Sequence, residues 1–306
     1  MKKLEVIGKR QYKGQYTIII PVIVIATLAW LVFWLIPNFG TFFYAFQDMN
    51  GNWTFDNFRE MWRSLTTGGG SLAISFKNTF TFFFLGVFVD LPLTLIVVYF
   101  CFKKIAGYKF FRIIFYLPAI ISSVALTGVF KSFIATNGPL GKICESIGIY
   151  LPNEGLLGTV ETAIDTIVAY HIWTCVSSGL LLLSGTMGRI PVEILESAKL
   201  EGCGVGRELV NIIIPLMWPT ISTMVIMKVA GIISATGPIL LLQPDPLLGT
   251  STLSYWMFRQ VYGNGGYGGT GQYGLVSAMG TFFTLIVIPL TLFCRHMAEK
   301  VPAVEY

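Results

Sequence analysis

Two charged side chains lie deep inside long apolar segments of this sequence. Asp90 falls within the apolar run 78–102, and Lys228 falls within the run 209–235. A charge at the centre of a bilayer-spanning helix is costly, so such a residue faces the interior of a helix bundle and needs a partner. Either the two side chains pair and hold two helices together, or one of them binds the hydroxyl groups of a solute.

A second set of charged residues lies between two apolar runs. Pro191 suits the first turn of a helix, where its missing N–H costs nothing. Glu193 and Glu196 favour a helix N-terminus electrostatically. Gly202 suits the position just after a helix end. The pattern therefore predicts a short helix and a turn, followed by a second helical turn that leads to Pro215.

The predicted helix in the segment 188–208 has an apolar stripe and a charged face. The stripe is expected to consist of Ile194, Leu195, Ala198 and Leu200. Such a helix lies either on lipid headgroups or in a groove of a partner protein. Lipid-bound helices usually carry Lys and Arg on the polar face, whereas this segment leans acidic, with Glu193, Glu196, Glu201 and Glu208. The composition favours docking to a partner.

Patterns for other chemistry are weak in this sequence. The five cysteines are scattered and form no CxxC pair, so we expect no metal site. His171 is interpreted as a hydrogen-bonded helix residue. The string Gly266-x-Gly268-x-x-Gly271 follows no predicted strand, which argues against a dinucleotide site.

The composition indicates an integral membrane protein. Hydrophobic residues make up 54% of the chain and charged residues 12%, against about 25% charged residues in a soluble domain. A span needs about 20 apolar residues. We expect an all-α, polytopic membrane protein with one transmembrane domain, 1–306, and six spans at about 17–36, 78–102, 113–134, 166–187, 209–235 and 273–294.

The basic residues predict the orientation of these spans. Most of the 21 Lys and Arg residues fall at the N-terminus, in the two loops 103–112 and 188–208, and at the C-terminus. Since Lys and Arg collect in cytoplasmic segments, both termini and the 188–208 loop are expected to be cytoplasmic. The net charge of +5 is explained in the same way, and we expect no nucleic-acid partner because no basic–aromatic groove segment is present.

The 188–208 segment resembles the EAA loop of the permease subunits of binding-protein-dependent ABC importers. That loop has Glu-Ala-Ala, three residues and Gly, and then an Ile-x-x-Pro-like stretch about a dozen residues later. Here Glu196-Ser197-Ala198 is followed by Gly202 and then by Ile212-Ile213-Ile214-Pro215. Ser197 stands for the first Ala, Glu201 for the usual Asp, and Cys203 for a following Ala.

The resemblance extends along most of the chain, to the carbohydrate-uptake branch that includes maltose, multiple-sugar and glycerol-3-phosphate permeases. Four segments of this chain resemble short sequence motifs of that branch: Asp56-Asn57-Phe58, Asn78-Thr79, the run Phe110 to Pro118, and the run Gly271 to Ala278. The outer segment from Gly237 to Thr250 departs from the family pattern.

The resemblance implies a type I importer permease fold in a bacterial plasma (inner) membrane. Its implied partners are a second, non-identical permease subunit, two cytoplasmic ABC ATPase subunits, an extracytoplasmic solute-binding protein and membrane lipid. The loop residues Glu193, Glu196, Ser197, Ala198, Glu201 and Gly202, with Pro215, would couple the spans to the ATPase. ATP and Mg would reside in that ATPase, so no cofactor is expected in this chain; the sequence has no GxxxxGK[ST].

Alternatives remain open at this point. The solute could be a phosphodiester, polyamine or amino acid rather than a carbohydrate. A polytopic membrane enzyme is disfavoured because no HExxH, no GxSxG and no paired intramembrane aspartates occur. A secondary transporter would normally show internal repeats and ion-linked groups.

Overall fold

A computed structural model describes residues 19–48, 50–66, 70–234, 238–263 and 273–301. Every regular element in these ranges is a helix. The basic N-terminal residues, the start of the first predicted span, Ala235 and the glycines 266–271 lie outside the described residues. The chain divides into unit 1 (1–62 and 269–282) and unit 2 (63–268 and 283–306), which are described separately.

Unit 1 contains a continuous helix, Ile19–Ala45, which includes η1 (Leu31–Leu35) and α2 (Ile36–Ala45). Two further helices start in it, α3 (Asp56–Thr66) and α15 (Tyr273–Glu299). Asn57 donates from Nδ2 to the carbonyls of Ala45, at 3.1 Å, and Gln47, at 2.9 Å. A Cβ at Gly274 would lie 2.6 Å from the Asn57 Oδ1 atom, so only glycine fits there. Asn57 and Gly274, which belong to two of the segments that resemble the family, therefore lie against each other in unit 1.

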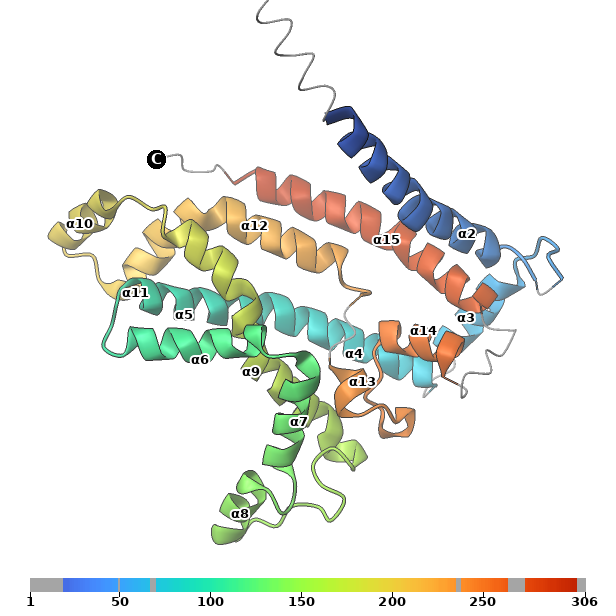
Figure 1. The fold of residues 1–306 in the computed structure, drawn as a ribbon, viewed down its shortest axis with the longest axis horizontal. Helices are drawn as coiled ribbons and strands as arrows, with labels where there is room; N and C mark the ends of the chain where they lie inside the picture. Colours follow the sequence, from blue (N-terminus) through green and yellow to red (C-terminus); the bar gives the residue numbers. More distant parts are fainter. Residues whose placement is uncertain (1–18, 49, 67–69, 235–237, 264–272, 302–306) are drawn as a thin grey trace, which may run out of the picture. The chain divides into compact units, whose positions relative to one another are not determined.

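Unit 2 holds three long helices and several short ones (Figure 1). The first long helix, Ser71–Phe102, comprises α4 (Ser71–Leu85), η2 (Gly86–Asp90) and α5 (Leu91–Phe102). The second is α9 (Val160–Met187), and the third, Val205–Ala230, comprises α11 (Val205–Glu208), η3 (Leu209–Ile213) and α12 (Ile214–Ala230). The short elements are α6 (Tyr108–Ile120), α7 (Ser123–Ile134), α8 (Pro139–Ser146), α10 (Val192–Leu200), α13 (Ile239–Leu242), η4 (Pro246–Leu248) and α14 (Leu253–Tyr262).

Within the described ranges, five helices are long and apolar enough to cross a membrane, and a bent pair makes a sixth if it counts as one span. The protein is thus a multi-pass membrane protein. The bent pair differs from the expected continuous span at 113–134, because α6 and the following helix meet at 112°. Ile121 is extended, and Ser122 caps α7 by accepting a hydrogen bond from the Ala125 N–H. A serine cap can start a new helix inside an apolar run, and hydropathy alone does not reveal it.

Three π-helical turns occur in the described helices, and each ends two residues before a proline. They are η1 before Pro37, η2 before Pro92 and η3 before Pro215. Proline lacks an N–H and its ring clashes with the carbonyl four residues earlier. A widened turn accommodates both effects without ending the helix. The π-helical turns thus explain how these long helices continue past a proline.

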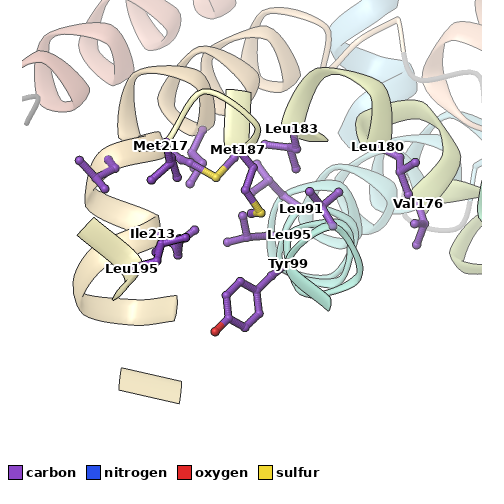
Figure 2. Packing of buried hydrophobic residues seen from close by; sticks show 14 of the residues in the cluster. Leu91, Leu95, Tyr99, Val176, Leu180, Leu183, Met187, Leu195, Ile213 and Met217 are labelled. Carbon is purple, nitrogen blue, oxygen red and sulfur yellow. The ribbon is translucent and has the colours of Figure 1, made fainter. Parts of the chain in front are cut away.

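The main core of unit 2 lies among α5, α9 and α12. Buried side chains from these helices form one cluster (Figure 2), which includes Leu95, Tyr99, Leu183, Met187 and Met217. Leu195 of α10 and Ile213 of η3 belong to the same cluster. The short helix α10 is therefore anchored in the core of the long helices.

Candidate functional site

The segment 188–208 folds as an elbow, which we define as α10, the turn 201–204 and α11. It stands at one end of unit 2, beside the ends of α5 and α12 (Figure 1). Gly202 ends α10 with a φ of +75°, as the sequence predicted for a C-terminal cap. Its N–H donates to Lys199 O and the Cys203 N–H donates to Ala198 O, which is the Schellman arrangement.

One face of α10 holds the elbow to the rest of unit 2. Leu195 and Ala198 are buried, and Ile194 is half-buried. The predicted apolar stripe was wrong for Leu200, which is 89% exposed. At 100° per residue, Leu200 points away from Leu195 and joins the opposite face.

That opposite face presents the predicted loop residues to solvent. Glu193, Glu196, Ser197, Glu201 and Gly202 are all exposed. The remaining two predicted residues are elsewhere: Ala198 is buried beneath the elbow, and Pro215 is half-buried in the first turn of α12. The elbow thus offers a partner a small surface of carboxylates and hydroxyl around an apolar tip, Leu200.

A buried ion pair that the sequence did not predict fixes the base of the elbow. The Lys103 Nζ atom lies 2.6 Å from Oε1 and 2.8 Å from Oε2 of Glu208. The Glu208 side chain is 5% exposed, and the Lys103 side chain is 31% exposed. The Tyr99 hydroxyl also donates to Val205 O at 3.4 Å. The end of α5 is therefore tied to α11, and only the apolar surroundings of Glu208 could have indicated that this glutamate points inward.

The two predicted intramembrane charges lie together on one side of the core. Asp90 Oδ2 is 3.4 Å from Lys228 Nζ and 3.0 Å from His171 Nε2. These residues come from η2, α12 and α9, so one carboxylate joins three long helices. We call this group the charge cluster. The sequence predicted that His171 is hydrogen-bonded but did not indicate Asp90 as its partner.

The charge cluster has room for the lysine and leaves one acceptor unused. A Cβ at Gly86 would lie 3.2 Å from Lys228 Nζ, so this glycine makes space for the ammonium group. The Asp90 side chain is 7% exposed, and its Oδ1 atom has no hydrogen-bond partner in the described part of the chain. A buried carboxylate oxygen normally has a donor. Oδ1 is therefore left with unused hydrogen-bonding capacity.

A cavity of about 550 Å³ lies between the end of α6 and the helices α7, α9, α13 and α14, and Tyr170, the residue before His171, lines it. Its lining is mainly apolar and includes the rings of Tyr170, Tyr255 and Phe258 with the hydroxyls of Ser123 and Thr174. Burial raises the pKa of Tyr255, and its hydroxyl donates to Pro244 O at 2.7 Å. Aromatic faces with a few hydroxyl groups suit an uncharged, hydroxyl-rich solute.

Asn78 and Thr79 attach the segment 249–253 to α4. Asn78 donates from Nδ2 to Gly249 O at 2.7 Å and to Ser251 O at 2.9 Å. Thr79 accepts a hydrogen bond from the Leu253 N–H at 2.8 Å. Asn78 and Thr79, one of the segments that resemble the family, thereby position α14, which carries two of the aromatic rings of the cavity.

Sequence comparison finds relatives over nearly the whole length of the chain. It is 27% identical to the probable ABC transporter permease protein YesP of Bacillus subtilis, covering 95% of this chain and 92% of that protein. It is 25% identical to the multiple sugar-binding transport system permease protein MsmF of Streptococcus mutans, covering 95% and 96%. No family model matches the sequence.

Two solved structures have the same architecture. One is a bacterial ABC transporter involved in the import of the acidic polysaccharide alginate, with a TM-score of 0.79, 21% identity, and coverage of 95% of this chain and 99% of that chain. The other is the alginate transporter in complex with an alginate pentasaccharide-bound periplasmic protein, with a TM-score of 0.80, 18% identity, and coverage of 95% and 97%. The chain has the fold of an ABC importer permease.

The relatives confirm the resemblance to ABC importer permeases that the EAA-like segment indicated. They are named as transport permeases and not as enzymes, which agrees with the expectation of a transport subunit. In a permease of this fold, the elbow and the charge cluster are the two candidate sites, one at the end of the spans and one between them.

Proposed function

We propose that this chain is a membrane subunit of an ATP-driven importer for a carbohydrate that an external solute-binding protein delivers. The elbow carries the proposal. It is anchored in the core through Leu195 and Ala198, yet exposes Glu193, Glu196 and Leu200 at the end of the spans. A short rigid helix of this kind fits a groove in a partner.

In this proposal the partner is a cytoplasmic ABC ATPase, and the elbow transmits its movement. When ATP closes the ATPase dimer, the elbows of this chain and of a second permease move together. Because α10 is packed into the cluster that contains α5, α9 and α12, the long helices move with it. The spans then alternate between inward- and outward-facing states. We also propose that both termini lie in the cytoplasm, because basic residues collect on that side of a membrane.

The carbohydrate assignment has two supports. Relatives are named for multiple-sugar transport and diacetylchitobiose uptake, and the cavity offers aromatic rings and hydroxyl groups to a sugar. Other relatives are named for sn-glycerol-3-phosphate transport, so a phosphorylated polyol is the competing solute class. A phosphorylated solute needs uncompensated cations, whereas the Lys228 charge is matched by Asp90.

Uptake in reconstituted vesicles tests the proposal. The tagged chain is purified from its native membrane with the proteins that accompany it, which should include an ATPase, a second permease and a binding protein. Loaded vesicles should then accumulate labelled oligosaccharide only with internal ATP. Accumulation of glycerol phosphate but not of sugar would remove the carbohydrate assignment, and ATP-independent uptake would remove the importer assignment.

The docking assignment needs its own test, because the transport result does not locate the contact. A cysteine at Leu200 should cross-link to the ATPase subunit, whereas a cysteine at exposed Val129 of α7, far along the chain from the elbow, should not. If the cysteine at position 200 remains accessible to a bulky water-soluble maleimide in the assembled transporter, the elbow is not the docking element.

A further inference from the structure

A second hollow in unit 2 lies at the ends of α5, α6 and α9, at the same end of α5 that is tied to the elbow. It has a volume of about 310 Å³. Two cations, Lys104 and Arg112, line it together with the hydroxyl-bearing residues Tyr108 and Ser184. No acidic side chain lines it, so its polar lining is suited to an anion.

The two cations have no carboxylate partner in the described part of the chain. Neighbouring Lys103 is paired with Glu208, whereas Lys104 and Arg112 make no ion pair there. Arg112 lies instead over the ring of Tyr116, with 5.6 Å between the guanidinium carbon and the ring centroid. Lys104 has a φ of +52°, which is unusual for a residue other than glycine. Lys104 thus lies in a turn with an unfavourable backbone conformation, and it lines the hollow without an ion-pair partner.

The outer surface of α6 suggests what kind of anion occupies it. Phe110, Ile113, Leu117 and Ile120 repeat at helical spacing and are all exposed, from 47% to 78%. They form an apolar stripe on the outer side of α6, about 140° around the helix from Tyr108 and Arg112, and exposed Phe111 and Ile114 lie between this stripe and Tyr108. An amphiphile with an anionic head in the hollow can lay its acyl chain across Phe111 and Ile114 towards this stripe, which a free phosphate ion cannot do.

We propose that this hollow binds the phosphate headgroup of an anionic glycerophospholipid. Basic pockets between transmembrane helices are typical sites for such headgroups. The phosphate would accept hydrogen bonds from Lys104, Arg112 and the Tyr108 hydroxyl. The site is independent of which solute is transported, because it involves neither the charge cluster nor the elbow surface.

Lipid titration of the purified full-length chain tests this proposal, with binding followed by native mass spectrometry. The lipids are phosphatidylglycerol and zwitterionic phosphatidylcholine. The charge variant is K104Q/R112Q, and the matched control is K109Q/K300Q, which removes two exposed cations that do not line the hollow. Each cation near a lipid headgroup contributes about 5-fold to affinity, so the charge variant should bind phosphatidylglycerol about 25-fold more weakly. The control should stay within about 2-fold.

A third variant and a soluble competitor separate the remaining outcomes. S184L fills the hollow without changing charge and should weaken phosphatidylglycerol binding, provided that helical content and gel-filtration behaviour are retained. Equal binding of phosphatidylglycerol to K104Q/R112Q and to the unmodified chain would overturn the proposal. Equal binding of phosphatidylcholine would also overturn it. Displacement of the lipid by sub-millimolar inorganic phosphate would show a site for a free anion and not for a lipid.

Discussion

The elbow and the charge cluster use acidic residues in opposite ways. The carboxylates of Glu193 and Glu196 are exposed on α10, so neither side chain is part of the buried packing. Asp90 is 5% exposed, and the bundle depends on it because it contacts side chains from two other helices. An exposed carboxylate can bind a partner protein that associates and dissociates. A buried carboxylate first stabilises the fold of its own chain, and only then can it contact a solute.

The sharpest test of this contrast compares Asp90 with Glu196. Asp90→Leu leaves Lys228 and His171 between helices without their carboxylate, and breaking such a pair should cost about 3 kcal/mol of stability. Glu196→Leu removes an exposed carboxylate and should change stability by less than about 0.5 kcal/mol. Thermal unfolding in detergent measures both.

The double variant D90L/K228M sharpens the same comparison. It removes both charges of the pair, so it should be more stable than D90L alone. Uptake should remain low in the double variant if Asp90 Oδ1 also accepts a solute hydroxyl, and should recover if the cluster only joins helices. Equal stability of D90L and the unmodified chain would show that the cluster does not hold the bundle together.

Glu208 is an acidic residue of the elbow that behaves like the charge cluster. Glu208→Gln keeps the shape but leaves Lys103 unpaired, and it should cost about 2 kcal/mol because Lys103 is partly hydrated. The charge-swapped variant K103E/E208K should recover part of the loss. If the swap is no better than E208Q, the pair does not fix the base of the elbow. Unfolding and ATP-driven uptake are measured in parallel.

These residues show how far the sequence could lead. The elbow was predicted well because its helix, cap and turn depend on neighbours within about a dozen residues, and the EAA-like spacing lies in the same short segment. The charge cluster could be predicted only as two costly charges, since the third member, His171, is 81 positions from Asp90. The Lys103–Glu208 pair was missed because a glutamate in a charged segment is normally exposed. The bend after α6 was missed because an apolar run has the same hydropathy whether it is straight or bent.

Substitution of Gly202, in the turn of the elbow, should reduce stability less than substitution of Asp90 or Glu208. Gly202→Val places a β-branched side chain at a φ of +75°, which should cost about 1–2 kcal/mol although, beyond the two adjacent residues, no atom of the described part of the chain lies within 4 Å of the added Cβ. Gly202→Asn is the matched control because asparagine adopts this conformation more readily. Uptake should follow the same order, with valine far below asparagine. Equal uptake in the two variants would show that the angle of the elbow does not matter for coupling.

Leu200 should give the smallest effect on stability and yet a clear effect on assembly. Its side chain is 89% exposed, so Leu200→Ala should leave the melting temperature of the isolated chain within about 1 °C. If the elbow docks as proposed, an apolar tip seated in a groove contributes about 10-fold or more to the affinity for the ATPase. Val129→Ala of α7 is the control, because it removes an exposed apolar side chain of similar kind away from the elbow. A pull-down titration with the ATPase measures the difference. Unchanged affinity in L200A would mean that the carboxylates alone carry the contact, and the elbow would then resemble an ordinary charged surface.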